Sequence, residues 1–410
     1  MGDCQEQRLE DVVMFKLKKD LKLLAGSLNI NKSPSKIFEK NIIEFLSNLS
    51  QEILGNKNFK IYPDLISFGF WCRKTNLLQI KKNYASRRLS RGIAFHICPA
   101  NVPMNFAFSM CLGLLSGNSN VVRIPSIKFN QVSILCNLIK KILKKKKFLI
   151  LKKKICLISF PRSDHISNEI SKIADVRLIW GGDKTVQNFK SYETKPRCID
   201  LNFANRYSFS VINSKIFNKL SLNGIRNLSK NFFTDTYTMD QNGCSSPKSI
   251  FWIHKTLEKK KKVFWDEILK LANNSFDLDL TKASKKYYEI NKDVIRKKKF
   301  FQHNFKNFKV VKINLKSLKD LKYLEYIQPG YGVFVEANIK DLRILRKFLS
   351  SRSQTMTYFG YSKNNIEQKI LDNNFKGVDR VVKIGNAFQM SHIWDGFDII
   401  NILSREVHLQ

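Results

Sequence analysis

Cys244 is the strongest candidate for chemistry in this chain. It lies in the segment 240–247, whose sequence is DQNGCSSP, a polar turn between two apolar segments. A nucleophilic thiol needs a lowered pKa and open approach, and the backbone amides around a Gly-Cys-Ser turn can provide both. The alternative is an inert thiol, as most lone cysteines are. The pattern therefore indicates covalent catalysis on a carbonyl, with Cys244 as the nucleophile.

Asn101 is the second candidate. It lies between Pro99 and Pro103 in the loop PANVP, and the two prolines restrict the backbone on either side of it. A rigidly held carboxamide is a good hydrogen-bond donor to an oxyanion, the negatively charged oxygen that forms when a carbonyl is attacked. Asparagine in a proline-rich loop is equally a turn former. Both interpretations stay open at this point.

Gly181 and Gly182 precede a polar helical segment in the sequence GGDK. A glycine pair at a strand-to-helix junction allows backbone amides to approach a phosphate at the helix N-terminus. Most such glycines merely turn the chain, and no GxGxxG is present, so the ordinary Rossmann fingerprint is absent. The pair is a candidate phosphate loop that needs further support.

The elements that would position these residues alternate between short apolar strands and helices, which is typical of a parallel sheet covered on both faces. Such a sheet binds ligands at the carboxyl ends of its strands, where the loops of Asn101 and Gly181 are expected. We expect strands at 93–98, 121–124, 155–160, 175–180, 197–201, 208–212, 249–253, 310–311 and 333–335. We expect helices at 105–116, 130–143, 255–299 and 340–350, and a mostly helical region over residues 1–90, including the apolar positions of 12–24 and 42–49.

The composition is strongly basic, with 72 Lys+Arg against 34 Asp+Glu and a formal charge of +38. Such an excess is typical of proteins that bind nucleic acid, anionic membranes or polyanionic substrates. Here the lysines are spread along the chain without interleaved aromatic residues, and Lys, Asn, Ile and Phe are abundant together, as in an A/T-biased genome. We therefore expect no specific nucleic-acid partner, and the charge suits an anionic substrate.

The cysteines indicate neither a metal site nor a disulfide framework. The chain has eight, without a CxxC and without paired spacing to histidine, so no metal is expected and a reducing cytoplasm fits best. We expect no secretory signal at the N-terminus, and the longest apolar stretch, 104–117, is too short to span a bilayer.

Several motifs, taken in order, resemble the acyl-CoA reductases, which include the reductase component of the bacterial luminescence fatty-acid reductase complex and belong to the aldehyde dehydrogenase superfamily. The resemblance covers the chain from about residue 60 to the C-terminus. It rests on the segments YPD (62–64) and FWCRK (70–74), CPANVP (98–103), VVRIPS (121–126), IWGGD (179–183), QNGCSSP (241–247), QTMTYFG (354–360), GVDR (377–380) and WDG (394–396).

The resemblance implies an aldehyde-dehydrogenase-like α/β fold, with a nucleotide-binding parallel-sheet domain and an α/β catalytic domain. It implies NADPH-dependent reduction of a fatty acyl thioester to the aldehyde, with Cys244 as the nucleophile and Asn101 together with the Cys244 amide as oxyanion donors. In the superfamily a lysine contacts the nucleotide ribose. The match here is Arg123, displaced by one position, near Ser126, and a cation there could suit a 2'-phosphate. Gly181 and Gly182 match the loop under the pyrophosphate.

One departure from the superfamily bears on the direction of the reaction. Members that oxidise aldehydes carry a glutamate that activates water to hydrolyse the acyl-enzyme. A gap-free alignment puts Asn202 at that place, and a shift of two would put Asp200 there. Without a base, water attack should be slow, and the acyl-enzyme should wait for hydride or another thiol. The departure favours thioester reduction.

Four domains follow from the resemblance and the element pattern. Residues 1–90 form a mostly helical segment packing on the cofactor domain, 91–213 the nucleotide-binding domain, 214–375 the catalytic domain, and 376–410 a segment that returns to the core or to an oligomer interface. The segment WDG near the C-terminus is expected to be structural. We expect a homo-oligomer that takes acyl groups from acyl-CoA or acyl carrier protein, with an acyl-transferase or synthetase as a possible partner.

Three other functions stay open on the sequence. The first is an acylating aldehyde dehydrogenase that works oxidatively with NAD. The second is acyl transfer through a Cys244 thioester without redox chemistry. The third is a basic protein that binds nucleic acid or a membrane surface on an inactive dehydrogenase scaffold.

Overall fold

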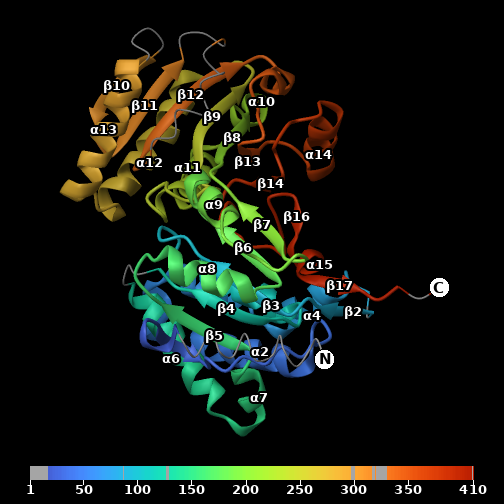
Figure 1. Ribbon diagram of the computed structural model, residues 1–410. Coiled ribbons are helices and arrows are strands. Elements are labelled where there is room, and N and C mark those ends of the chain that lie inside the picture. Colours follow the sequence, from blue (N-terminus) through green and yellow to red (C-terminus); the bar gives the residue numbers. More distant parts are fainter. Residues whose placement is uncertain are drawn as a thin grey trace. The chain divides into compact units, whose positions relative to one another are not determined.

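The computed structural model describes residues 17–85, 87–125, 129–296, 301–315, 319, 330–408 and 410. The chain forms two compact units, each built around its own sheet (Figure 1). The first unit comprises Met1–Ala204 and Met390–Gln410, and the second comprises Asn205–Gln389. The units are defined by packing within the chain, and the four functional domains drawn from the sequence stay a prediction.

The sheet of the first unit has six strands in the order β1-β5-β4-β3-β6-β7. All neighbours are parallel except β1 and β5. From β3 the chain adds β4 and β5 on one side, and then returns to add β6 and β7 on the other. The direction of winding therefore reverses between β3 and β6, which is where open α/β sheets bind ligands. The strands are β1 (Lys22–Gly26), β3 (Ile93–Ile97), β4 (Ser119–Arg123), β5 (Ile155–Ser159), β6 (Val176–Trp180) and β7 (Ile199–Phe203).

Helices cover both faces of this sheet. Alternate strand residues point to opposite faces, so that Ala94 belongs to one apolar core and Phe95 to the other. Figure 1 shows α8 on one face of β3–β5, and α2 and α6 on the other. The helices are η1 (Leu17–Lys19), α2 (Lys40–Gly55), η2 (Lys57–Ile61), α3 (Pro63–Trp71), α4 (Lys74–Lys81), α5 (Asn105–Leu115), α6 (Asn130–Leu143), η3 (Lys146–Phe148), α7 (Leu149–Lys152), α8 (Asp164–Ile173), α9 (Asp183–Lys190) and α15 (Ile399–Leu403).

The helix expected over 12–24 is wrong in its described part. Residues 1–16 lie outside the described residues, a single 3-10 turn covers Leu17–Lys19, and Lys22–Gly26 is the edge strand β1. The backbone of β1 pairs antiparallel with β5, for example Leu23 with Ile158. The apolar residues of this segment have helical spacing, but they form an edge strand of the sheet. In a short apolar segment, pairing with a neighbouring strand can decide the structure over the local spacing.

A buried polar network ties β3 to its neighbours. His96, fully buried on β3, contacts Ser109 Oγ through Nδ1 (2.7 Å) and Asn120 Oδ1 through Nε2 (2.9 Å). Trp180 Nε1 donates to the same Ser109 oxygen at 3.0 Å. Since the amide oxygen of Asn120 can only accept, Nε2 carries the proton and Nδ1 accepts from Ser109. Burial lowers the pKa of His96 to about 4, so the network holds a neutral imidazole at neutral pH.

The C-terminal residues return to the first unit. β17 (Ser404–Glu406) pairs with β2 (Arg88–Ser90), and α15 buries Ile399, Ile400 and Leu403 in the core that includes α5. Before them, β15 (Ile393–Trp394) and β16 (Phe397–Asp398) form a hairpin. Its two turn residues, Asp395 and Gly396, have φ of 51° and 78°, as a type I′ turn requires. The segment WDG at 394–396 is therefore a hairpin turn anchored by the buried Trp394.

The sheet of the second unit has seven strands in the order β10-β11-β12-β9-β8-β13-β14. Its neighbours are parallel except β10 and β11. Here the chain adds β9 and β12 on one side of β8, and then β13 and β14 on the other, so the winding reverses between β8 and β13. The strands are β8 (Tyr207–Asn213), β9 (Pro247–Ile253), β10 (Phe301–Asn307), β11 (Val310–Leu315), β12 (Val333–Ile339), β13 (Ser353–Phe359) and β14 (Arg380–Lys383).

Two apolar cores flank this sheet as well. One joins residues of α13, η5 and α14 to the sheet, and the other joins residues of α10, α11 and α12 to it. The parallel α/β architecture predicted from the sequence is thus confirmed in both units. The helices are α10 (Ser214–Phe217), α11 (Leu222–Tyr237), α12 (Glu258–Ser275), α13 (Leu280–Arg296), η5 (Leu342–Lys347) and α14 (Lys363–Asp372).

Candidate active site

Cys244 lies in the turn that leads into β9, at the amino end of a central strand of the second unit. Its side chain is half-buried, and the turn is closed by the Ser246 amide, which donates to the Gly243 carbonyl at 3.0 Å. The strand that follows, Pro247–Ile253, is buried at every position. The thiol is thus held on a rigid element while retaining some access to solvent.

Gln241 braces this turn from inside the protein. Its buried amide donates to the carbonyls of Pro247 and Val333, both at 2.9 Å, and accepts from the backbone amides of Gly332 and Val333 at 3.0 and 3.1 Å. The backbone of Gln241 itself has a φ of 60°, in the left-handed region that non-glycine residues seldom adopt. These four bonds hold the strained entry to the turn in one conformation.

Ser208 braces the other side. Its hydroxyl donates to the Cys244 carbonyl at 2.7 Å and accepts from the Thr355 amide at 3.1 Å. Ser208 and Thr355 lie near the amino ends of β8 and β13. The backbone of the candidate nucleophile is therefore fixed to the strands beside it.

Gly243 is required by the close approach of Phe388. A Cβ at this position would meet the Phe388 ring at 2.9 Å, closer than side chains allow. The loop that carries Phe388 is held from two sides: Asp235 accepts from the amides of Gly385 (2.6 Å) and Ala387 (2.8 Å), and Arg380 donates to the Ala387 carbonyl (2.6 Å). A positioned aromatic ring thus lies beside the turn of Cys244.

Lys248 is a buried cation next to the candidate nucleophile. It is only 7% exposed, as the second residue of β9, and no ion pair to a carboxylate forms among the residues that the structure describes. Burial lowers the pKa of Lys248 to about 7, and attraction to the Cys244 thiolate opposes part of that shift. The same attraction favours the thiolate, because Coulombic coupling between two groups is mutual.

The other described cysteines offer a contrast. Burial raises the pKa of Cys136 and of Cys156 to about 12, and that of Cys198 to about 11. It also raises the pKa of Cys98 and Cys72. A buried thiol that stays protonated is a poor nucleophile. These thiols behave as small apolar side chains.

Asn101 is placed at the carboxyl end of β3 in the first unit. It is exposed in the turn between β3 and α5, and the Asn105 amide donates to the Val102 carbonyl (3.1 Å) where that helix begins. The side chain is on the surface, as a group that meets a ligand must be.

Arg123 ends β4, the strand beside β3. Its guanidinium carbon lies 4.7 Å from the centre of the Phe160 ring, and its buried Nε has no hydrogen-bond partner in the described residues. Burial, followed by the charge of nearby Arg162, lowers the pKa of Arg123. Two arginines without a carboxylate partner in the described part of the chain make this edge of the sheet favourable for an anion. Ser126, the other residue expected here, lies outside the described residues.

Gly181 and Gly182 follow β6 directly and lead into α9. A Cβ on Gly182 would have no atom within 4 Å, so the space above this residue is open. A Cβ on Gly181 would meet Thr185 at 3.0 Å, which ties the first glycine to helix packing. Gly182 is the member of the pair that leaves room for a ligand against the backbone.

Neither residue at the place of the superfamily glutamate is a free carboxylate. Asp200 makes a two-point ion pair with Arg177 on the neighbouring strand, with N–O distances of 2.7 and 2.6 Å. Asn202 is an amide, and its half-buried side chain keeps an Oδ1 without a partner in the described residues. Both oxygens of the Asp200 carboxylate are therefore already engaged by the guanidinium of Arg177.

The structure thus gathers Asn101, Arg123, Gly181 and Gly182 at the carboxyl ends of three adjacent strands, β4, β3 and β6, of the first unit. Cys244 belongs to the second unit. The sequence analysis missed Lys248 and Arg162. A lysine inside an otherwise apolar buried strand could have pointed to Lys248, whereas the proximity of Arg162 to Arg123 had no sequence signal. Over the described ranges, no group of three or more His, Cys, Asp or Glu is arranged to hold a metal.

A family model described as Acyl-CoA reductase (LuxC) matches residues 76–406. The chain belongs to this acyl-CoA reductase family. The resemblance noted in the sequence is confirmed. No curated protein matches the chain. In the part of the chain that the structure describes, no helix has the length and apolar character needed to cross a membrane.

Solved structures similar to this chain are aldehyde dehydrogenases. With 3,6-anhydro-L-galactose dehydrogenase in complex with NAP, the TM-score is 0.63 at 9% identity, covering 98% of this chain and 90% of that one. With the putative aldehyde dehydrogenase PutA from Anabaena variabilis, it is 0.61 at 12% identity, covering 98% and 91%. With lactaldehyde dehydrogenase from Escherichia coli, it is 0.59 at 10% identity, covering 89% and 85%.

The chain is also similar to a longer protein, proline utilization A from Bradyrhizobium japonicum, with a TM-score of 0.61 at 12% identity. The match covers 90% of this chain but only 42% of that one, so this chain spans about two fifths of the length of proline utilization A. At identities of 9–12%, these similarities show the fold alone. The aldehyde-dehydrogenase-like α/β fold predicted from the sequence is confirmed.

Proposed function

We propose that the protein reduces a fatty acyl thioester to the fatty aldehyde with NADPH, through an acyl thioester on Cys244. The observation that carries this proposal is the half-exposed thiol in a braced turn beside a buried lysine, in a chain of the acyl-CoA reductase family. The bracing fixes where the sulfur attacks, and the lysine supports its ionised form.

In the first step, the Cys244 thiolate attacks the thioester carbonyl of the acyl donor. A bond forms between this sulfur and the carbonyl carbon, the bond to the donor sulfur breaks, and the donor leaves as a thiolate. One thioester replaces another, so the exchange is nearly balanced in free energy. Protonated Lys248 would favour the Cys244 thiolate before attack.

Negative charge develops on the carbonyl oxygen in this step, and again when the acyl-enzyme is reduced. Fixed hydrogen-bond donors lower the energy of both transition states. We assign this role to the Asn101 carboxamide and the Cys244 backbone amide. The hydrogen bond from Ser208 to the Cys244 carbonyl supports the assignment, because it fixes the orientation of the peptide groups around the turn.

The nicotinamide cofactor would be held at the carboxyl edge of the first sheet, where it supplies the hydride that reduces the thioester. The residues fit such a group: Gly182 leaves open space against the backbone, and Arg123 keeps a buried donor without a partner in the described residues. Arg123 and Arg162 would together favour the additional 2'-phosphate of NADPH. A solved protein of this fold contains NAP.

The reduced intermediate is a thiohemiacetal on Cys244. It collapses when the carbon–sulfur bond breaks, which releases the aldehyde and regenerates the Cys244 thiolate. Hydrolysis of the preceding acyl-enzyme would need a base to activate water. The ion pair between Asp200 and Arg177 supports reduction over hydrolysis, because it keeps that carboxylate occupied.

The acyl donor would be acyl-CoA or acyl carrier protein, both anionic and so suited to a chain with a formal charge of +38. An acyl-transferase or synthetase could supply the acyl group as a partner. A homo-oligomer in the cytoplasm remains our expectation for the assembly and its location.

The test is mass spectrometry of the protein incubated with acyl-CoAs of graded length, without a reductant. We expect one acyl adduct, on the peptide that carries Cys244, and its release as aldehyde when NADPH is added. Cys244→Ala should abolish both signals, while Cys198→Ala should leave them unchanged. Unchanged aldehyde formation by Cys244→Ala would remove this residue from the mechanism. Release of the free acid in place of aldehyde would contradict the reduction.

A further inference from the structure

A cleft of about 400 Å³ opens on the second unit, away from the turn of Cys244. It is lined at the ends of β8, β9 and β13, by residues such as Asn213, His254 and Gly360, which follow or end those strands. Cys244 precedes β9, whereas His254 follows it. Seven strand residues separate the two ends, which corresponds to roughly 20 Å.

The cleft lies where the winding of this sheet reverses. β8 and β13 are neighbours, and the chain moves to opposite sides of the sheet from them. Open α/β sheets bind ligands outside the carboxyl ends of the strands at such a switch point. In the first unit, the equivalent position between β3 and β6 carries the loops of Asn101 and Gly182. The second unit has the same topological opening, and neither Cys244 nor the cofactor loops use it.

The charges in the cleft favour an anion. Lys215 and Lys369 line it, and among the described residues neither forms an ion pair. The one acidic lining residue, Asp341, is already engaged: Arg343 donates to it from its side chain (3.0 and 3.2 Å) and its backbone amide (2.8 Å). These bonds hold the pKa of Asp341 below its usual value. The two lysines therefore leave a positive balance in the cleft.

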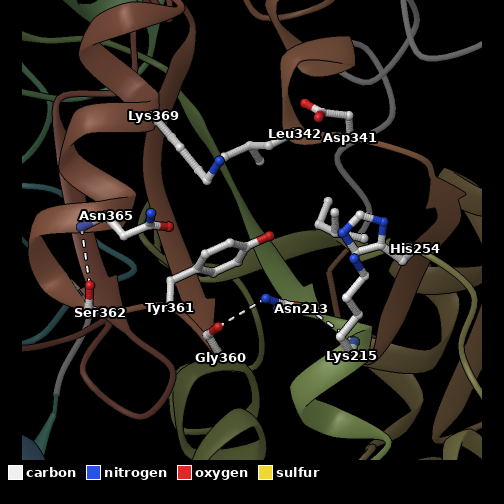
Figure 2. A pocket seen from close by; sticks show the side chains of 11 residues that line it. Asn213, Lys215, His254, Asp341, Leu342, Gly360, Tyr361, Ser362, Asn365 and Lys369 are labelled. Carbon is white, nitrogen blue, oxygen red and sulfur yellow. Dashed lines mark hydrogen bonds between the residues drawn. The ribbon is translucent and has the colours of Figure 1, made fainter.

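Besides the two lysines, the hydroxyl group of Tyr361 lines the cleft as a hydrogen-bond donor. The side chains of Lys369 and Tyr361 extend from one wall, and those of Lys215 and His254 from the other (Figure 2). Burial and the charge of Asp341 raise the pKa of Tyr361 to about 12, so its hydroxyl keeps its proton and can donate. Ser362, the N-cap residue of α14, also lines the cleft.

His254 is held in an uncommon backbone conformation at this place. Its φ is 70°, in the left-handed region, and its amide donates to the Ile339 carbonyl at 2.8 Å. For a residue other than glycine this conformation is strained, and such conformations are concentrated at ligand sites. The strained turn directs the chain away from β9 and leaves the imidazole on the wall of the cleft (Figure 2).

We propose that this cleft is a second ligand site, which binds a phosphorylated small molecule through Lys215, Lys369 and Tyr361. The volume is at the lower end of the range for small-molecule sites and suits a group the size of a mononucleotide. The shared chemistry is a phosphoryl group, whether free or on a nucleotide or coenzyme. A site so far from Cys244 along the sheet does not take part in acyl transfer, so it would act as a regulatory or anchoring site.

The experiment is lysine labelling of the intact protein, read by mass spectrometry, with inorganic phosphate, AMP or CoA as separate probes. We expect at least one probe to protect Lys215 and Lys369 from acetylation, while Lys230, exposed on α11 outside the cleft, is labelled as before. Protection by phosphate alone would identify a free anion, and protection by AMP or CoA only would identify a nucleotide-bearing ligand. Absence of protection by all three at millimolar concentration would overturn the proposal.

Variants localise the effect. Lys215→Ala combined with Lys369→Ala should weaken calorimetric binding of the protecting probe at least about tenfold, since each lysine contributes a charge-assisted bond. Lys230→Ala should leave it unchanged, because this lysine lies outside the cleft. Asn365→Trp, an exposed change on α14, should block the cleft without altering its charge. If both the double lysine variant and Asn365→Trp bound the probe with wild-type affinity, the binding site would lie elsewhere. Acylation of Cys244 should be unaffected throughout, so this test is independent of the proposed reaction.

Discussion

The two sheets of this protein share one winding pattern but carry their candidate chemistry on opposite edges. In the first unit, β5-β4-β3-β6-β7 places Asn101, Arg123 and Gly182 at the carboxyl ends of the strands. In the second, β12-β9-β8-β13-β14 has the same order of addition, yet Cys244 lies at the amino end of β9. The carboxyl edge of the second sheet carries the cleft with Lys215 and Lys369.

The difference reflects what each edge of a parallel sheet offers. At the carboxyl edge, strands run out into loops and helix N-termini, whose amides and added cations suit phosphate groups. At the amino edge, a turn can be hydrogen-bonded to the first residues of the adjacent strands. Ser208 on β8 donates to the Cys244 carbonyl, and Gln241 in the turn donates to the Pro247 carbonyl at the start of β9. Such bracing suits a nucleophile whose position must be fixed. If this division is right, variants of the two edges should fail at different steps.

The largest effect should come from Asn101→Ala. Loss of one oxyanion donor typically slows turnover by about 10²- to 10³-fold. Because charge develops on the carbonyl oxygen in both steps, the variant should slow acylation of Cys244 by acyl-CoA and its reduction by NADPH. Rapid-quench mass spectrometry without cofactor measures the first step, and absorbance of NADPH measures the second.

Asn101→Asp is the matched control. Aspartate forms turns as asparagine does but, when ionised, cannot donate to an oxyanion. It should therefore be as slow as the alanine variant. Recovery of the wild-type rate in Asn101→Asp would show that the side chain only shapes the loop.

The next effect should come from Arg123→Leu, which tests the carboxyl edge of the first sheet alone. Removal of a charge-assisted contact to the 2'-phosphate should weaken the use of NADPH by about 10- to 100-fold. NADH, which lacks this phosphate, should be affected little, and acylation without cofactor should not change. Steady-state kinetics with both cofactors measure the ratio. An equal loss with NADH and NADPH would mean that Arg123 serves the fold through Phe160.

Some elements of the fold follow from the sequence, and others do not. The strands β3, β5 and β6 and the helix Asn130–Leu143 were predicted nearly residue by residue, because buried parallel strands and an amphipathic helix have strong local patterns. β1 was mistaken for a helix, because its apolar spacing is decided by pairing with β5. An edge strand gains its stability from a partner that a local pattern does not reveal.

The site shows the same limit. Cys244, Asn101 and the glycine pair carry motif signals that one sequence can display. Lys248 was missed because the strand was expected to begin at Ser249, which left the lysine in a loop, whereas the strand begins at Pro247 and buries it. The cleft at β8 and β13 depends on strand order, and no local pattern encodes which strands become neighbours.

Lys248→Met should produce a smaller and pH-dependent effect, on the amino edge of the second sheet. The pKa of Lys248 is lowered to about 7, so the ammonium is present below that pH and is lost above it. We expect acylation by acyl-CoA to be about tenfold slower than wild type at pH 6, equivalent to about one pKa unit of lost attraction. The two proteins should converge near pH 9. A constant ratio across this range would indicate a packing role only.

The smallest effect concerns the pH dependence of the free energy of unfolding. A buried group in each unit should make stability change with pH, but over a different pH range. His96 has a pKa of about 4 in the folded first unit, against about 6.5 for an unperturbed histidine. Between these values the unfolded chain binds more protons, so stability rises with pH from 4 to 6.5 and is lost as the pH falls. The full shift corresponds to about 3 kcal/mol. Urea unfolding at a series of pH values should show this slope.

His96→Gln should flatten the slope, while His165→Gln, a change at an exposed residue of α8, should retain it. For Lys248 the lowered pKa moves the corresponding window to between about 7 and the ordinary lysine value, with the same sign, because the buried amine is again less protonated than in the unfolded chain. Lys248→Met should therefore flatten the slope only on the alkaline side. If His96→Gln flattened the alkaline slope instead, the two buried groups would not belong to separately responding units. The neutral imidazole network around β3 and the buried amine of Lys248 would then have to be treated as one titrating core.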